Sequence, residues 1–452
     1  MRNVNVQDFG AVGDGVTMDT AAVQAAVDQC SAGGGGRVTV SGGTFLVGRI
    51  DLKDGVDLHI ERDAVLSGSA DGRDFPEIES DLWDVRYAPR FNRRCMIYAE
   101  GCRDIALTGR GAIDCQGENY ITPLYGGTPE EAMKLYADRH FPEGAEGDAL
   151  WPFMRKAFPD RFEDEGSRGL PAKQRALCSL SPARVALFMK CENVLVEDVT
   201  MRNQPSGWSY WICGCENVHF HRAVIRASVL YPNNDGIHIN CSKNVTVSDC
   251  SIACGDDGIV IRAYSAPLGR PVPCEKVTVT NCNITSHSGG FRIGWYDDGV
   301  IRDCAFSNLT ITDTTVGVDI FLPDTPKDHR GSDQGIEDTL IENLSFSNIV
   351  MDRIFYEPVR ILVGDGCRCA GVKDLYFTGL RARAVHMPSV IGREGCPVKN
   401  LYFDQCHFTS IDRASIPDEA VGPHCARPWS MSPYFKHVEN VVMNGTTFTV
   451  GE

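Results

Sequence analysis

The chain has 452 residues, of which 43% are hydrophobic, and carries a formal net charge of −16. This acidic balance argues against a nucleic-acid partner, because neutralising phosphates needs a basic face. No run of about 18 apolar residues is present, so we expect no membrane span.

The first eight residues contain no apolar segment typical of a secretory signal, and we expect a cytoplasmic protein. Nineteen cysteines are present, many inside repeated segments. Their number is odd, and they show no paired spacing typical of zinc sites. We therefore expect buried free thiols, a reducing compartment, and neither metal nor cofactor.

The first predicted element is a helix from Thr20 to Cys30, where apolar residues recur at helical spacing. Asp19 or Thr20 is its expected N-cap. A helix this close to the N-terminus would cover the open end of a repeat protein. The four glycines 33–36 then predict a turn into Arg37–Val40, which we expect to be the first strand.

An insertion is predicted at about 118–180, because the repeats stop after Asp114 and resume at Val185. Thr128 is a helix start signal, so the segment should be partly helical. We expect it to line the mouth of a cleft. Trp151 and Phe153 could meet sugar rings there or pack within the insertion.

Five pentapeptides in the second half of the chain share one pattern, with glycine second and apolar residues third and fifth, except that the last has Pro358 in place of glycine. They are Asp235–Ile239, Asp257–Ile261, Gly289–Ile293, Val316–Ile320 and Glu357–Ile361. The glycine position advances by 22, 32 and 27 residues. Such a period with strand patterning indicates one coil of a solenoid.

A second set of repeats supports this interpretation. Copies of one short strand begin at Cys191, Cys215, Ser242 and Cys274, and later copies follow. Each coil therefore holds at least two short strands and is too short for a crossover helix, so equivalent strands must stack in parallel. We predict an all-β protein, a parallel β-helix that forms a single domain over residues 1–452.

The repeats bring three acidic residues together. Side chains alternate along a strand, so Ile237 and Ile239 face the core and His238 faces out. Asp235 precedes one strand, and Asp256 and Asp257 precede the next, about 4.8 Å away. Each aspartate alone could be a turn residue. Stacked on consecutive coils, they resemble the acid and base of a glycoside hydrolase.

Several motifs then match one family. They are Asp8–Gly15, Gly111–Gly117, Asn233-Asn234-Asp235-Gly236 and Gly255-Asp256-Asp257. In this order and spacing the chain resembles glycoside hydrolase family 28, the polygalacturonase family. The resemblance implies a right-handed parallel β-helix and hydrolysis with inversion. It also implies Asp256 as general acid, Asp235 and Asp257 as the residues that activate water, and Asn233 as an orienting residue.

Two family motifs are altered. Gly289 stands where the G-H-G motif has histidine, with His287 two residues upstream as a candidate substitute. The R-x-K motif, which grips a galacturonate carboxylate, aligns with Asp319–Phe321 and has lost both cations. We hypothesise that Arg292, with Arg262, takes over sugar recognition and that Asp319 holds Arg292. A salt-bridged surface ladder is the alternative.

The predicted function is hydrolysis of pectic or related oligosaccharides, including those that contain uronic acids, by aspartate acid/base catalysis. His238 is a further candidate for substrate binding. One alternative is a β-helix polysaccharide lyase, which would need a calcium cage and a basic proton abstractor. Another is a non-catalytic carbohydrate-binding fibre. In each case the partner is an oligosaccharide or polysaccharide.

Overall fold

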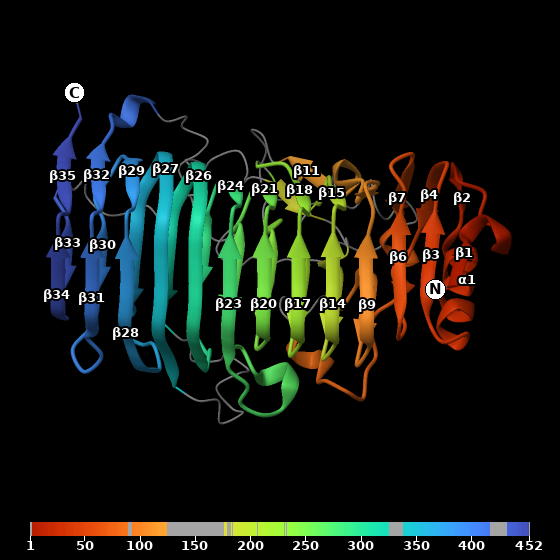
Figure 1. Ribbon diagram of the computed structural model, residues 1–452, viewed down its shortest axis with the longest axis horizontal. Helices are drawn as coiled ribbons and strands as arrows, with labels where there is room; N and C mark the ends of the chain where they lie inside the picture. Colours follow the sequence, from red (N-terminus) through yellow and green to blue (C-terminus); the bar gives the residue numbers. More distant parts are fainter. Residues whose placement is uncertain are drawn as a thin grey trace, which may run out of the picture.

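The computed structural model describes residues 2–88, 93–123, 176–178, 182, 184–205, 207–229, 231, 233–324, 338–415 and 432–451. In these ranges, 33 strands join in parallel ladders and wind into a β-helix, along which the chain runs from one end to the other (Figure 1). Each coil contributes strands to three stacks. The predicted fold class, an all-β parallel β-helix, is confirmed.

The three stacks are defined by their pairings. The first contains β1 (Arg2–Asn5), β3 (Gly36–Val40), β6 (Val56–Ile60), β9 (Arg103–Thr108), β14 (Glu192–Glu197), β17 (Glu216–His221), β20 (Lys243–Ser248), β23 (Cys274–Thr280), β28 (Cys369–Thr378), β31 (Val398–Asp404) and β34 (Val438–Asn444). The second contains β2 (Asp14–Met18), β4 (Gly43–Val47), β7 (Ala64–Gly68), β10 (Ala112–Asp114), β15 (Thr200–Arg202), β18 (Val224–Arg226), β21 (Ser251–Cys254), β24 (Asn283–Ser286), β29 (Arg381–Ala384), β32 (His407–Ser410) and β35 (Thr447–Val450).

The third stack carries the pentapeptides. It contains β5 (Ile50–Asp51), β8 (Cys95–Glu100), β13 (Arg184–Met189), β16 (Trp208–Cys213), β19 (Ile237–Asn240), β22 (Ile259–Arg262), β25 (Gly289–Ile293), β30 (Ser389–Ile391) and β33 (Tyr434–Lys436). Two long strands, β26 (Val300–Leu322) and β27 (Thr339–Val363), run through all three stacks. The ladder pairs Ile237 with Ile259, Ile259 with Phe291, and Phe291 with Val318, as the repeat predicted.

Helices are few. α1 (Thr20–Ala32) lies at the end of the β-helix that includes β1, opposite β33, β34 and β35 (Figure 1). The described 3₁₀ helices are η1 (Val6–Phe9), η2 (Gly72–Asp74), η3 (Val85–Tyr87), η5 (Gly117–Asn119), η8 (Ala266–Leu268) and η10 (Arg413–Ser415). No helix among the described residues is both long and apolar enough to cross a membrane.

The predicted N-terminal helix is confirmed, and it buries its apolar face as expected. Asp19 occupies the N-cap position, but its carboxylate accepts hydrogen bonds from the backbone of Val12 and Gly13 at 2.7 and 3.0 Å. It therefore orders the preceding turn. The prediction that Arg37–Val40 is the first strand was wrong, because the short strands β1 and β2 precede it and β1 pairs with β3.

The insertion falls largely outside the described residues, which include only its edges. There β11 (Ile121–Pro123) pairs antiparallel with β12 (Ala176–Cys178). Trp151 and Phe153 also lie outside the described residues. The extent and helical content of the insertion stay predictions.

Close backbone approach explains the glycine column. A Cβ on Gly236 would lie 2.1 Å from the carbonyl oxygen of Gly258, and one on Gly258 would lie 2.8 Å from that of Gly290. The next coils repeat the arrangement. A Cβ on Gly290 would lie 2.7 Å from the carbonyl oxygen of Gly317, and one on Gly317 would lie 2.6 Å from that of Pro358. Any larger residue would push successive coils apart.

The interior is filled by like side chains in register. The rings of Phe306, Phe346, Phe377 and Phe403 stack at 4.7, 4.9 and 4.9 Å between centroids. The described cysteines are free thiols, and all but Cys369 are buried, which agrees with their predicted place in the core.

Outside the core, Asn193, Asn217 and Asn244 hold left-handed turns and hydrogen-bond one another at 3.1 Å. These ladders fix the register in which the functional residues meet.

Candidate active site

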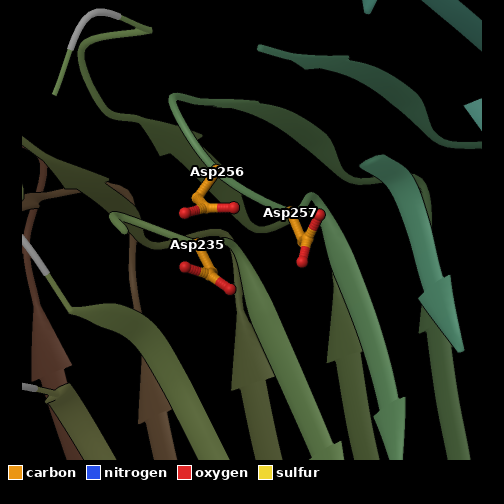
Figure 2. A group of neighbouring side chains, drawn as sticks. All are labelled: Asp235, Asp256 and Asp257. Carbon is orange, nitrogen blue, oxygen red and sulfur yellow. The ribbon is translucent and has the colours of Figure 1, made fainter. Parts of the chain in front are cut away.

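Three aspartates meet where the chain passes from the second stack to the third. Asp235 lies just before β19, and Asp256 and Asp257 lie just before β22 on the adjacent coil (Figure 2). One carboxylate oxygen from each lies within 4.8 Å of the others. Asp235 and Asp257 are 4% and 9% exposed, and Asp256 is half-buried. The predicted cluster is therefore present.

The backbone around the cluster is tied to neighbouring coils. The carbonyl of Asp235 accepts hydrogen bonds from the amide and hydroxyl of Ser209 at 2.9 and 2.8 Å. The carbonyl of Asp256 accepts one from the Ser286 hydroxyl at 2.5 Å, and that of Asp257 accepts one from the Gly236 amide at 2.9 Å. The three side chains thus start from a fixed backbone.

Asn234 connects the turns that carry the acids. It is fully buried, and its Oδ1 accepts a hydrogen bond from the Gly255 amide at 2.6 Å. Its Nδ2 donates to the carbonyl of Ser228 at 2.8 Å. Gly255 directly precedes the Asp256–Asp257 pair, so Asn234 couples the two motifs. The sequence analysis missed this role, although the residue stands inside the N-x-D motif.

Asp235 is held by His238, which lies three residues along the chain. The distance between His238 Nε2 and Asp235 Oδ2 is 2.6 Å. His238 points away from the core, as predicted, but it is only 4% exposed because Trp208 stacks on its ring, with centroids 3.5 Å apart. Its neighbours in the ladder are Trp211 and Val260.

Asp257 is surrounded by hydrogen-bond donors. Its Oδ1 accepts from the Ser288 hydroxyl at 2.8 Å, the Gly289 amide at 2.9 Å and Arg292 Nη2 at 3.2 Å. Its Oδ2 accepts from Arg292 Nε at 3.1 Å. Asp257 is therefore a hydrogen-bond acceptor in each of these contacts. Ser288 and the Gly289 amide were not predicted as partners, and only their position in the altered G-H-G motif could have indicated them.

Arg262 has a different partner. Its Nε lies 2.9 and 2.7 Å from the two carboxylate oxygens of Asp298, which has no exposed surface. Burial raises the pKa of Asp298 above its ordinary value, and Arg262 opposes that shift. Arg262 is thus engaged in a buried ion pair, and it contacts none of the three acids.

The remaining predicted residues lie at the edges of the cluster. Asn233 is 8% exposed in a left-handed turn, and its carbonyl accepts a hydrogen bond from the Gly207 amide at 2.6 Å. His287 is half-buried, with its ring 5.6 Å from that of Phe355. The roles of both residues stay predictions.

The predicted contact between Asp319 and Arg292 is present, with Arg292 Nη1 2.7 Å from Asp319 Oδ2. Of the predicted binding residues, His238 thus contacts Asp235 and Arg292 contacts Asp257. The acids could also hold a metal ion, because their oxygens are close enough to share one. Three carboxylates this close are equally suited to acid/base chemistry at a common water.

Comparison with known proteins identifies the family. The model of glycosyl hydrolases family 28 matches residues 170–392, which include all three acids. A model described as rhamnogalacturonase A/epimerase, pectate lyase-like, matches residues 3–59. A probable polygalacturonase of Vitis vinifera is 25% identical over 328 residues, 70% of this chain and 56% of that protein. The chain belongs to glycoside hydrolase family 28.

A second relative and a solved structure are also similar to this chain. The exo-poly-alpha-D-galacturonosidase of Dickeya chrysanthemi is 25% identical over 70% of this chain and 51% of its own length, so the chain spans about half the length of these two relatives. Among solved structures, the exopolygalacturonase of Thermotoga maritima has a TM-score of 0.68 at 22% identity, covering 98% of this chain and 92% of the other. This structural likeness supports the β-helix fold.

Proposed function

We propose that the protein is a glycoside hydrolase that cleaves O-glycosidic bonds of pectic or related oligosaccharides, including those that contain uronic acids. The observation that carries this proposal is the cluster of Asp235, Asp256 and Asp257 within 4.8 Å, inside the segment that matches family 28. The names of the relatives, polygalacturonase and exo-poly-alpha-D-galacturonosidase, support a pectic substrate.

We assign the roles of base and general acid among the three aspartates as follows. The groups that contact Asp257 all donate hydrogen bonds to its carboxylate, so we assign Asp257 the role of the base that takes a proton from water. Asp235, held by His238, would share that water. We assign the protonation of the leaving oxygen to Asp256, the most exposed of the three acids, as the family resemblance implies.

Inversion is part of the proposal, and family membership is what supports it. Inverting enzymes usually separate their two carboxyl groups by about 6.5–9.5 Å to leave room for water, and retaining enzymes by about 5–5.5 Å. Here the closest oxygens of three carboxylates lie within 4.8 Å. A water shared by Asp235 and Asp257, with Asp256 facing the leaving group, would reconcile three close acids with a single displacement.

We also propose that the substrates are short fragments taken up into the cytoplasm, because polymers do not enter cells. The buried free thiols suit a reducing compartment.

The test is release of reducing ends from oligogalacturonides and related pectic oligosaccharides. Asp256→Asn should lose at least about a hundredfold in turnover, since protonation by a positioned group contributes about 10²–10⁴. The matched control is Asp249→Asn, which alters an exposed aspartate in a left-handed turn and should keep full activity. Equal activity of wild type and Asp256→Asn would refute the proposal. Calcium-dependent formation of an unsaturated product would instead show that the protein is a polysaccharide lyase.

A further inference from the structure

A chain of alternating charges leads away from Asp257 across successive coils. Arg292 contacts Asp257, Arg292 Nη1 lies 2.7 Å from Asp319, and Arg360 binds the same Asp319 at 2.8 and 2.6 Å. The ladder register places Arg292, Asp319 and Arg360 side by side on β25, β26 and β27. One end of this chain is therefore a proposed catalytic group.

The guanidinium of Arg292 is already occupied. All three of its nitrogens contact Asp257 or Asp319, and the residue is 6% exposed. The rings of Trp295 and Phe321 lie 5.4 and 5.2 Å from its central carbon. Burial opposes its charged form, but Asp257 and Asp319 outweigh this and raise the pKa of Arg292. Binding a sugar carboxylate would require breaking these contacts.

The shape of these contacts fits orientation of a carboxylate. Arginine presents a planar fork, and here Nε and Nη2 take the two oxygens of Asp257 separately. The Gly289 amide and the Ser288 hydroxyl hold Oδ1 as well. With both oxygens held, the carboxylate cannot rotate. Asp319 is fixed in turn by Arg360, and neither residue has more than 6% exposure.

We propose that Arg292 is a positioning residue, which orients Asp257 toward the water while Asp319 and Arg360 hold Arg292 in place. The inference rests on the proposed function, because it takes Asp257 as the base. It revises the hypothesis that Arg292 recognises the sugar. The missing R-x-K cations are therefore not replaced by Arg292, whose charge serves the catalytic carboxylate.

The first test compares Arg292→Gln and Arg292→Lys with wild type on oligogalacturonides or the best pectic substrate found. Arg292→Gln should lower kcat about 10- to 100-fold and leave KM within about twofold, because a displacement near 1 Å can cost that much. Arg292→Lys keeps the charge but lacks the fork, so it should recover only part of kcat. Arg302→Gln, which breaks an ion pair with Glu275 in the first stack, should keep wild-type kinetics.

The pH profile adds a readout that a purely structural role would not move. The charged groups that face Asp257 include Asp235, Asp256 and Arg292, with Asp319 and Arg360 behind Arg292. Loss of the cation favours a protonated base. As the pH is lowered, Arg292→Gln should therefore lose activity at a higher pH than wild type does. Arg292→Lys should return this acid limb of the pH profile to its wild-type position.

Separate outcomes distinguish the two proposals. A wild-type protein inactive on every pectic substrate would refute the proposed function. A raised KM with unchanged kcat in Arg292→Gln would overturn the positioning role in favour of substrate recognition. A crystal structure of Arg292→Gln in which Asp257 keeps its orientation would overturn it without reference to activity. If Arg292→Gln does not fold, Asp319→Asn weakens the contacts of both Arg292 and Arg360 while keeping Arg292 on Asp257, and it should also lower kcat at unchanged KM. Unchanged kcat would refute the inference.

Discussion

Replacing Gly289 with alanine tests the geometry around Asp257 most simply. A Cβ at this position would lie 2.9 Å from Asp257 Oδ1 and 3.1 Å from the carbonyl oxygen of Phe291. Ordinary contact begins near 3.4 Å, so the carboxylate would have to retreat by about 0.5 Å. Its 2.9 Å bond to the Gly289 amide would lengthen accordingly.

A displacement of this size reaches the limit of about 0.5 Å within which catalytic groups must be held. We expect kcat/KM of Gly289→Ala to fall about tenfold, since a 1 Å misplacement can cost about a hundredfold. The free energy of unfolding should fall by only about 1 kcal/mol, at the low end for overpacking, because the group that yields is a side-chain oxygen.

The assay is initial-rate kinetics together with urea unfolding. The control is Gly371→Ala, where the nearest atom to a new Cβ is 3.4 Å away, and neither activity nor stability should change. Full activity of Gly289→Ala with Asp257 unmoved in a crystal structure would refute the reasoning.

Three further predictions concern the β-helix around the site. Arg262→Met should lower the free energy of unfolding at neutral pH by about 3 kcal/mol, because it leaves the buried Asp298 carboxylate without its cation. Burial raises the pKa of Asp298, so acid neutralises this carboxylate and the loss of stability should shrink, which urea unfolding at two pH values would show. Phe346→Ala should lower the free energy of unfolding by about 3–5 kcal/mol in the same assay, because its ring is buried in the stack. Tyr376→Ala should lower it by less than about 1 kcal/mol, because this stacked ring is exposed. Burial lowers the pKa of His386 below 6.5, so the unfolded chain binds a proton that the folded chain does not, and stability should fall as pH drops below about 6.5. His386→Phe should flatten that slope, and an unchanged slope would contradict the assignment.

The stacking of the coils could be predicted because it depends on backbone contacts that leave a clear pattern. Gly236 and Gly258 are small because a Cβ on either would lie only 2.1–2.8 Å from a neighbouring carbonyl oxygen. Once that column is aligned, Asp235 and Asp257 must fall on adjacent coils. The first strand was misplaced because β1, only four residues long, shows no repeat of its own.

Burial of the outward-facing column could not be predicted. Alternation correctly placed His238 away from the core, but it says nothing about what lies over the outward-facing side chains. Trp208 covers His238, and Trp295 lies near Arg292. Nothing in the repeat pattern indicates these tryptophan contacts, so the burial of His238 beside Asp235 and of Arg292 beside Asp257 could not be predicted.

The altered G-H-G motif is explained by the same contacts. The amide of Gly289 binds Asp257 directly, and any Cβ there would press on the carboxylate. A histidine at 289 is therefore incompatible with the position that Asp257 takes when Arg292 holds it. Gly289 and Arg292 thus belong to one arrangement, because both contact the carboxylate of Asp257.

The proposed mechanism depends most on Asp235 and Asp257 activating one water while Asp256 protonates the leaving oxygen, in a single displacement. Proton NMR of the first product formed by the wild-type protein from an oligogalacturonide or the best pectic substrate measures this directly. The initial product should carry the anomeric configuration opposite to that of the cleaved bond and should be absent with Asp256→Asn. A first product with retained configuration would contradict the account.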